Sequence, residues 1–166
     1  MQILIVYAGK TGTTEKCAKM LGEKLNNATI VNLVEQNAGI SKYDLIIIGS
    51  SIRMGRFHSQ AKKFINNNKD MLKTKKTAYY VCCGFSSNYK QYFENNVSKE
   101  LLDNAIVYDT FGGELDVSKQ KGIEKFIVHM VSKSEEGKKE IRILNENIDR
   151  FVENIKEVGG KYNEKM

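Results

Sequence analysis

A short glycine- and threonine-rich stretch, residues 9–14 (GKTGTT), constrains this chain more than any other feature. It follows an apolar run, Ile3–Tyr7, whose length and β-branched content are typical of a buried strand. It precedes a segment in which Cys17, Leu21 and Leu25 recur at helical spacing. The stretch is therefore predicted to be the turn between a strand and a helix.

This turn has the composition of a phosphate-binding loop. Glycine lets a backbone approach a ligand closely, and Thr11, Thr13 and Thr14 supply hydroxyl groups. The first amides of the following helix have no partner within the helix and lie at the positive end of its dipole. We expect residues 9–14 to bind a phosphate without a metal. The alternative is an ordinary turn in which Thr13 or Thr14 caps the helix.

Two other nucleotide-binding motifs do not fit this turn. The nucleoside-triphosphate loop requires a glycine five residues before its second one, and Leu4 occupies that position. The dinucleotide fingerprint requires three glycines at fixed intervals, whereas only Gly9 and Gly12 are present, at the wrong interval.

Strands and helices alternate along the rest of the chain. Further strands are expected at 29–34, 43–49, 77–83 and 105–111, and helices at 13–25, from a Ser59 cap to 72, around 92–101 and at 140–158. This alternation predicts an α/β fold, a doubly wound five-stranded parallel sheet of order 2-1-3-4-5. One domain is expected over residues 1–158, followed by a polar tail at 159–166.

Ligands of such sheets bind beyond the carboxyl ends of the strands, where the winding changes direction. The loops after strands one, three and four are expected to meet there. These loops, at residues 9–14, 50–58 and 84–88, are the most polar glycine-bearing loops of the chain. Their predicted meeting point supports a phosphate-bearing ligand.

A long segment, residues 112–139, separates the fifth strand from the last helix. Within it, residues 122–133 (GIEKFIVHMVSK) place apolar side chains on one helical face and lysines on or near the other. A basic amphipathic helix can lie on a membrane surface or cover the crevice. The alternative is an extra helix packed on the core.

Composition limits the class of partner. The formal net charge is +6, from 26 basic and 20 acidic residues, which favours acidic proteins, anionic lipid headgroups or carboxylated substrates. No nucleic-acid module is recognised, so no nucleic-acid partner is expected. The chain shows neither a long apolar span nor a signal peptide. We expect it in the cytoplasm, with the 112–139 insertion as the segment that could touch the inner face of the membrane.

The three cysteines carry little functional signal. Cys17, Cys82 and Cys83 have the spacing of neither a zinc site nor a redox Cys-x-x-Cys pair. Cys17 lies on an apolar helical face, and the other two are neighbours in a predicted strand. We expect buried, unreactive thiols and no metal.

Residues 6–15 (VYAGKTGTTE) resemble the phosphate loop of the flavodoxin family, T/S-x-T-G-x-T followed by an acidic residue. Gly9 departs from this pattern, because it stands where the family has its first hydroxyl residue. The resemblance extends over nearly the whole chain and implies that FMN is bound non-covalently. A flavin-free interaction domain of the same fold is the alternative.

In that family, the loops after strands three and four flank the isoalloxazine ring. The resemblance implies that Met54 lies on one side of the ring, with Phe85, Tyr89 or Tyr92 on the other. The full set of expected FMN contacts is Gly9, Lys10, Thr11, Gly12, Thr13, Thr14, Ser51, Ile52, Arg53, Met54, Gly55, Cys83, Gly84, Phe85, Ser86, Tyr89 and Tyr92.

The Met54–Gly55 pair resembles the turn of some clostridial flavodoxins, in which the glycine peptide meets the flavin N5. Those proteins usually continue with an acidic residue, whereas this chain has Arg56. A unit charge about 5 Å from the ring, at an effective dielectric near 20, is worth roughly 3 kcal/mol before solvent screening. That energy is on the order of 100 mV for one electron, so Arg56 is expected to raise the potential. Arg53 and Arg56 are candidate tuning or substrate residues, and no catalytic acid or base is named.

Residues 49–58 (GSSIRMGRFH) resemble the G-A-S-I-R-Y-G-H-Y-H stretch of the flavodoxin-like, menaquinone-dependent protoporphyrinogen oxidases. Residues 111–115 (FGGEL) resemble their A-G-A-L turn, and both have a long insertion, which here is less aromatic and less arginine-rich. The resemblance implies an FMN-dependent oxidoreductase that passes electrons from a porphyrinogen-like substrate to a quinone or other acceptor. The alternative is a flavodoxin that carries electrons between redox proteins. The net charge counts against a carrier, because most such carriers are acidic.

Overall fold

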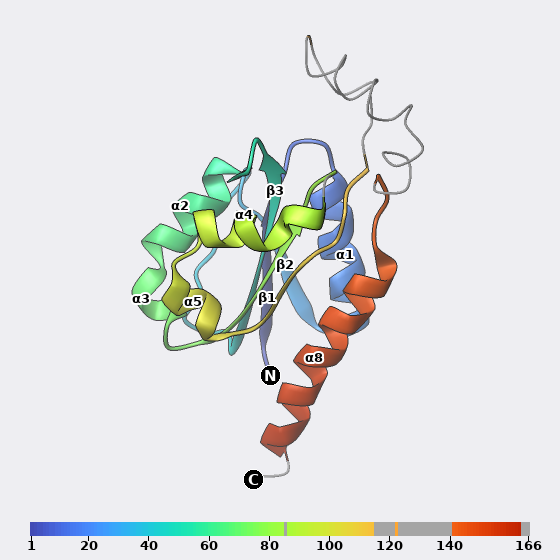
Figure 1. Ribbon diagram of the computed structural model, residues 1–166. Coiled ribbons are helices and arrows are strands. Elements are labelled where there is room, and N and C mark those ends of the chain that lie inside the picture. Colours follow the sequence, from blue (N-terminus) through green and yellow to red (C-terminus); the bar gives the residue numbers. More distant parts are fainter. Residues whose placement is uncertain (85, 115–121, 123–140, 164–166) are drawn as a thin grey trace.

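The computed structural model describes residues 1–84, 86–114, 122 and 141–163, and a parallel sheet forms its centre (Figure 1). The sheet has the order β2-β1-β3-β5-β6, and a short strand, β4, pairs antiparallel with β3. The strands are β1 (Ile3–Ala8), β2 (Ala28–Asn32), β3 (Leu45–Arg53), β4 (Arg56–Phe57), β5 (Lys76–Cys82) and β6 (Ala105–Thr110). The predicted doubly wound sheet is therefore confirmed, and β4 only changes the numbering of the last two strands.

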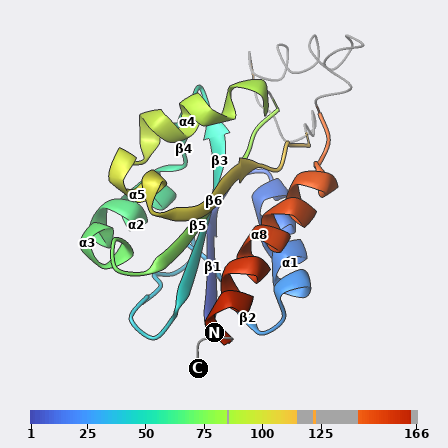
Figure 2. The ribbon, with the colours of Figure 1, turned by 60° about the horizontal axis from the view of Figure 1, so that its bottom comes forward.

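Helices cover both faces of the sheet (Figures 1 and 2). On one face lie α1 (Thr13–Leu25) and α8 (Asn145–Asn163). On the other lie α2 (Ser59–Asn67), α3 (Lys69–Leu72), α4 (Tyr89–Asn96) and α5 (Lys99–Asp103), with a 3-10 turn at Ser86–Asn88 before α4. None of the helices within these described ranges is long and apolar enough to cross a membrane.

The core consists of two apolar layers, one on each side of the sheet. In β3, Leu45 and Ile47 pack toward the α1 and α8 side, whereas Ile46 and Ile48 pack toward α2 and α4. All four side chains are buried. The alternation of sides along an apolar run explains why the strand predicted at 43–49 lies at the centre of a sheet covered on both faces.

Two helices predicted as continuous are each divided in the structure. The helix that begins at residue 59 ends at Asn67, and Asn68 donates its side-chain amide to the carbonyl oxygen of Phe64 at 2.8 Å. The helix predicted around 92–101 ends at Asn96, because Val97 has extended backbone angles. Asparagine side chains compete with the helical backbone for hydrogen bonds, so runs of asparagine favour helix ends.

The last helix begins later and ends later than predicted. Residues 141–144 return beside β6, where the amide of Leu144 donates to the carbonyl oxygen of Phe111 at 2.9 Å and that of Gly113 donates to Arg142 at 3.1 Å. This pairing, with a bridge between Gly112 and Ile143, keeps these residues out of the helix. At the other end, α8 continues to Asn163, past the helix end predicted near residue 158.

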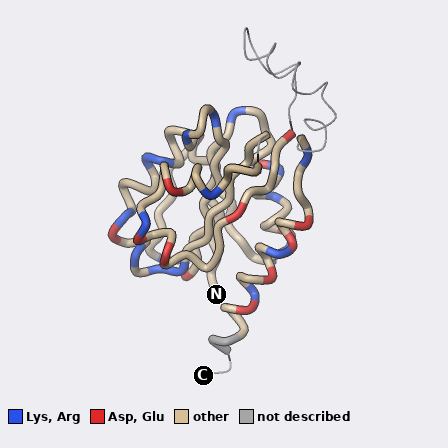
Figure 3. The backbone as a smooth tube through the Cα atoms, in the orientation of Figure 1, with Lys and Arg blue, Asp and Glu red and all other residues tan. Residues whose placement is uncertain are grey.

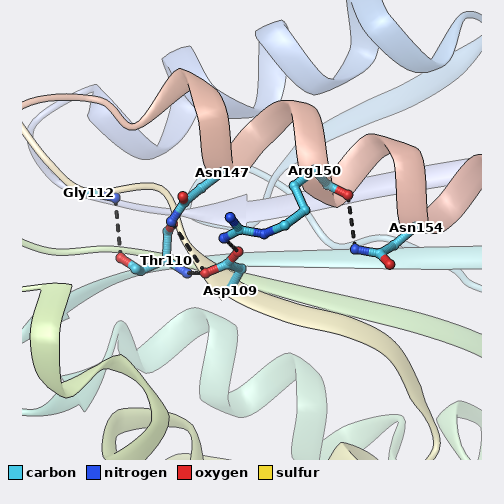
Figure 4. A network of polar contacts seen from close by, with 6 residues as sticks. All are labelled: Asp109, Thr110, Gly112, Asn147, Arg150 and Asn154. Carbon is cyan, nitrogen blue, oxygen red and sulfur yellow. Dashed lines mark hydrogen bonds and ion pairs between the residues drawn. The ribbon is translucent and has the colours of Figure 1, made fainter.

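A polar network fixes α8 on β6 (Figure 4). The buried carboxylate of Asp109 accepts hydrogen bonds from Arg150 at 2.7 Å and from the backbone amide of Thr110 at 2.8 Å. Asn147 donates to the carbonyl oxygen of Thr110 at 2.8 Å and, more weakly, to Asp109 at 3.4 Å. The hydrogen bond to Asp109 raises the pKa of Arg150. Helix α8 is thereby placed by polar contacts as well as by its apolar face.

Candidate functional site

The loops that follow β1, β3 and β5 lie at one end of the sheet, at the top of Figure 1. The turn after β1 lies close to the last part of β3, because a Cβ built on Gly9 would lie 3.8 Å from the Cβ of Ser51. The sheet order places the winding reversal between β1 and β3. The three loops therefore lie at the same edge of the sheet, as predicted.

The turn between β1 and α1 leaves the helix without a side-chain cap. Gly12 is the N-cap residue, with a φ of 90°, and as a glycine it contributes no side-chain cap. Thr13 and Thr14 are instead the first helical residues, and both are buried. The alternative in which Thr13 or Thr14 caps α1 is therefore wrong. The first amides of α1 keep the positive end of the helix dipole open to an anion.

Gly9 is required by the packing of this turn. A Cβ at position 9 would lie 2.7 Å from the hydroxyl oxygen of Thr14 and 2.9 Å from its Cβ. The Thr14 side chain thus occupies the space that a larger residue at position 9 would need. This contact explains why glycine stands where a hydroxyl residue was expected, with the Thr14 hydroxyl directed to the same place.

A buried tyrosine of β5 holds the turn between β1 and α1 in place through a hydrogen bond. The hydroxyl of Tyr80 donates to the backbone carbonyl oxygen of Thr14 at 3.0 Å. The ring stacks on Phe111 with centroids 4.7 Å apart. It fits because its neighbour on β3 is Gly49, where a Cβ would lie 2.0 Å from the ring. Sequence reasoning missed Tyr80, although a glycine inside an apolar strand signals the close approach of a neighbouring group.

The segment predicted as a polar loop at 50–58 is instead a β-hairpin. Strand β3 continues to Arg53, and β4 pairs with it through the partners Ile52 with Phe57 and Arg53 with Arg56. Met54 and Gly55 form the turn with φ values of 50° and 73°. Two successive positive φ values are typical of the tight turns of hairpins. The prediction failed because the alternation of apolar and basic residues over only two pairs is too short to identify a strand.

An asparagine of α4 holds the tip of this hairpin. The side-chain amide of Asn96 donates to the carbonyl oxygens of Gly55 at 2.9 Å and Tyr92 at 2.7 Å. Its side-chain oxygen accepts from the backbone amide of Phe57 at 3.1 Å. These contacts fix the hairpin against α4. Nothing in the sequence identified Asn96, because its partners come from a segment about forty residues earlier.

The structure separates the three aromatic candidates for the flavin ring. Tyr92 lies at the hairpin, where its ring is 3.9 Å from a Cβ built on Gly55. Burial, followed by the charge of Cys83, raises the pKa of Tyr92. Tyr89 instead packs edge-on against Phe93, with centroids 6.4 Å apart. Burial and then the charge of Asp109, on β6, raise its pKa. Phe85 lies outside the described residues.

The other candidates at the carboxyl edge are placed as follows. Cys83 is buried and follows β5, where its backbone amide donates to the carbonyl oxygen of Gly112 at 2.9 Å. Gly84 lies beside Gly113, since a Cβ on Gly113 would be 3.3 Å from its nitrogen. Ser86 begins the 3-10 turn before α4. The remaining candidates, Lys10, Thr11, Ser51 and Ile52, lie in the turn after β1 and in the last part of β3.

His58, rather than the predicted Ser59, caps α2. Its Nδ1 accepts a hydrogen bond from the backbone amide of Gln60 at 3.3 Å. Its own amide donates to the hydroxyl of Ser50 at 2.9 Å. Burial and then the charge of Lys10 lower the pKa of His58.

The three cysteines are buried, as the sequence predicts. Cys17, Cys82 and Cys83 are all buried, and none of the three forms a disulfide. The sulfur atoms of Cys17 and Cys82 lie 3.7 Å apart, and the sulfur of Cys83 lies 3.6 Å from the hydroxyl oxygen of Thr110.

Two surface cavities lie away from this edge. One, of about 270 Å³, is lined by residues of α2 and by Asn37 and Ala38, and the other, of about 310 Å³, lies beside residues 36–43. None of the residues that line these two cavities belongs to the loops after β1, β3 or β5. The helix terminus, the close approach at Gly9 and the fixed hairpin all lie at the carboxyl edge instead.

Comparison with known proteins gives one family-level match. A model of the flavodoxin domain matches residues 4–142 of this chain. Among curated proteins, protoporphyrinogen IX dehydrogenase (quinone) of Escherichia coli strain K12 is 29% identical over 86 residues. That alignment covers 48% of this chain and 47% of the relative, so the chain matches about half the length of its curated relatives.

Solved structures share the fold at low sequence identity. Oxidised flavodoxin 1 of Bacillus cereus aligns with a TM-score of 0.56 and 14% identity, over 94% of this chain and 98% of its own. A flavoprotein of Lactobacillus acidophilus NCFM in complex with FMN aligns with a TM-score of 0.52 and 17% identity, over 66% and 92%. At these identities the likeness shows a shared fold.

Proposed function

This chain belongs to the flavodoxin domain family, and we propose that it binds FMN non-covalently at the carboxyl edge of its sheet. The observation that carries this proposal is the start of α1. The helix has Gly12 at its N-cap and no side-chain cap, and Gly9 and Thr14 lie in contact beside it. A phosphate group would satisfy the open amides of the first turn and the nearby hydroxyls. The FMN in the name of the Lactobacillus acidophilus flavoprotein supports the same cofactor.

The residues of the site divide into two groups around such a cofactor. The phosphate would be held by Gly9, Lys10, Thr11, Gly12, Thr13 and Thr14. The ring would lie between the hairpin residues 51–55 and the segment that begins at Cys83, with Tyr92 as the aromatic residue beside the hairpin. Bound FMN supplies the electron-transfer chemistry, and the protein binds it, orients it and excludes water from part of its surface.

The effect of Arg56 on the reduction potential of FMN would be smaller than the effect of an unscreened charge. Arg56 is exposed on β4, and water and salt screen an exposed charge. The reduction potential would still be raised, because a positive charge beside the ring favours the reduced cofactor. We therefore propose Arg56 as a modest tuning residue and not as a catalytic one.

We propose further that the chain is an oxidoreductase similar to protoporphyrinogen oxidases. The resemblance of residues 49–58 to their Ser-Ile-Arg loop and the partial match to the Escherichia coli dehydrogenase support this assignment. Electrons would pass from a reduced substrate through FMN to a quinone or another acceptor. The test is to mix the FMN-loaded protein anaerobically with protoporphyrinogen and a menaquinone analogue. Porphyrin fluorescence should appear faster than in the same mixture without the protein, and an unchanged rate would remove this substrate.

The second candidate function is electron transfer between redox proteins. The alignment with Bacillus cereus flavodoxin 1 over 94% of this chain supports it. A potentiometric titration separates the two functions. A two-electron potential near that of menaquinone agrees with the oxidase-like function, and one far below it agrees with a carrier. Three buried thiols that form no disulfide support residence in the reducing cytoplasm for either function.

A further inference from the structure

The crossover from β2 to β3 contains no helix. Residues 33–44, which connect these strands, consist of turns and irregular chain. The other crossovers of the parallel sheet each contain a helix: α1 between β1 and β2, α2 and α3 between β3 and β5, and α4 and α5 between β5 and β6. A helix with its side chains is about 10–12 Å wide, whereas an extended chain occupies about 5 Å beside its neighbour. The segment 33–44 therefore covers less of the sheet than a helix would.

This narrow segment leaves a cavity between itself and α2. Leu33, Ile40 and Tyr43 anchor the segment in the same apolar layer as Phe64 of α2. The cavity between them has a volume of about 270 Å³, and Leu33 and Phe64 both line it. Each of these two side chains is 7% exposed, so they form an apolar floor. The volume is close to the lower end of the range for small-molecule pockets.

The polar side chains of this cavity are mainly hydrogen-bond donors. Lys63 of α2 lines it, and its ammonium group has no ion pair within the described part of the chain. Three carboxamides join it, from Asn37, Gln60 and Asn67. A fourth, that of Asn68, already donates to the carbonyl oxygen of Phe64. None of the residues that line the cavity is Asp or Glu, so no negative charge competes for these donors.

The surroundings of the cavity hold most of the positive charge of the chain. Residues 59–76, which include α2 and α3, contain six lysines and one aspartate, a net charge of +5 against +6 for the whole chain. Blue segments accordingly recur along α2 and α3 in Figure 3. Glu100 of α5 pairs with only one of these lysines, Lys73, at 2.9 Å. A concave site with low-dielectric walls focuses such a field, which favours an anionic ligand.

We propose that this cavity, named here the α2 cavity, binds a small carboxylate with an apolar body. The apolar body packs on Leu33 and Phe64, and the carboxylate accepts from Lys63 and the carboxamides. A carboxylate fits better than a phosphate, which binds well where helix amides are open. The amide of Gln60 at the start of α2 is already bonded to His58. The α2 cavity shares no residue with the proposed FMN site, so the two sites are independent.

The experiment titrates the full-length, ¹⁵N-labelled protein with benzoate and follows backbone amide shifts by NMR. The amides of residues 37–38 and 63–68, which belong to the cavity wall, should shift together. For a ligand of this size the expected dissociation constant is about 1–10 mM. The titration is run with and without added FMN, and the constant should agree within about twofold. Failure to bind FMN would remove the proposed function and leave this test intact.

Neighbouring lysines of α2 provide a matched pair of variants. Lys63→Gln removes the charge that lines the cavity, and Lys62→Gln removes that of an exposed lysine that does not line it. Each change lowers the formal net charge from +6 to +5, because one positive charge is lost. Benzoate affinity should fall about fivefold in Lys63→Gln and stay within about twofold in Lys62→Gln. Benzamide, an uncharged molecule of the same shape, should bind the wild type about fivefold more weakly than benzoate and be unaffected by Lys63→Gln.

Four results would overturn the proposal. The first is the absence of shifts at the cavity wall with benzoate at about 20 mM, well above the expected constant. The second is equal affinity for benzoate and benzamide, which would remove the role of the carboxylate. The third is an equal loss in Lys62→Gln and Lys63→Gln, which would assign the effect to net charge. The fourth is loss of benzoate binding when FMN is added, which would assign benzoate to the flavin site.

Discussion

The hydroxyl of Tyr80 donates a hydrogen bond to the backbone carbonyl oxygen of Thr14 across 3.0 Å, and both groups are buried. This bond ties the first turn of α1 to the centre of the sheet. The same turn holds the open amides that are proposed to bind phosphate. A residue far from any ligand contact therefore supports the position of the helix terminus.

Replacing this tyrosine should loosen the turn. Tyr80→Phe removes the hydroxyl but keeps the ring that stacks on Phe111. The loss of one buried hydrogen bond is expected to lower the free energy of unfolding by about 1 kcal/mol. Urea denaturation measures this change, and FMN affinity should fall in the same variant because the turn is less well held.

The neighbouring tyrosine provides the control. The hydroxyl of Tyr79 is buried and has no hydrogen-bond partner among the described residues, although Thr77 lies close to it. Burial raises the pKa of Tyr79 to about 12. Tyr79→Phe should therefore leave stability unchanged or raise it, because no bond is lost and a buried polar group is removed. Equal destabilisation of the two variants would show that the bond to Thr14 contributes nothing.

Enlarging Gly9 should weaken FMN binding. In Gly9→Ala the new Cβ would lie 2.7 Å from the Thr14 hydroxyl oxygen, and Thr14 is too buried to move aside. Overpacking of this kind costs about 1–3 kcal/mol, so the FMN dissociation constant should rise about tenfold. Quenching of FMN fluorescence gives the constant. Gly39→Ala is the matched control, because nothing lies within 4 Å of its added Cβ. An unaltered affinity in Gly9→Ala would contradict the packing described here.

Stability should fall as pH falls because of His58. Burial and Lys10 lower its pKa from the usual 6.5 in the folded protein. The unfolded chain thus binds more protons just below pH 6.5, and the contribution to stability is lost as pH falls through the folded pKa. Protonation also removes the Nδ1 acceptor that caps α2.

Urea denaturation at several pH values between about 5 and 8 tests this histidine. His58→Ser keeps a capping side chain but cannot titrate in this range. The wild-type protein should lose stability relative to His58→Ser as pH decreases. A difference between the two proteins that is constant with pH, or that grows in favour of the wild type at low pH, would refute the assignment.

The Asp109 network should be sensitive to loss of charge. Asp109→Asn replaces a buried carboxylate that accepts from Arg150 and Thr110. Hydrogen bonds to charged groups are worth about 1.5–3 kcal/mol, so unfolding free energy should fall by about 2 kcal/mol. Asp149→Asn is the control, because its ion pair with Lys24 is exposed and exposed pairs contribute about 0–1 kcal/mol. Similar losses in both variants would show that burial of Asp109 is not the cause.

The fold could be predicted from sequence because its signals are local. The apolar runs at Ile3–Tyr7 and 43–49, and the helical spacing from Thr13 to Leu25, each identify one element without reference to the rest of the chain. The order of the sheet then follows from right-handed crossovers between parallel strands. The phosphate-type turn was identified for the same reason, since its residues are contiguous.

The features that sequence reasoning missed depend on contacts between distant segments. Asn96 holds a hairpin about forty residues before it, and Tyr80 reaches back to Thr14. Residues 141–144 leave the last helix because they pair with residues 111–113. None of these contacts changes the local composition or periodicity of the chain. The insertion predicted to be an amphipathic helix, residues 122–133, lies outside the described residues apart from residue 122, and its role stays a prediction.

The central claim is that the turn at residues 9–14 binds the phosphate of FMN, and one comparison tests it directly. Isothermal titration of the purified protein with FMN and with riboflavin, which lacks the phosphate, gives both dissociation constants under the same conditions. The account predicts micromolar or tighter binding of FMN and at least about hundredfold weaker binding of riboflavin, a difference of about 2.7 kcal/mol. Equal affinity for the two flavins, or no binding of FMN at micromolar concentrations, would contradict it.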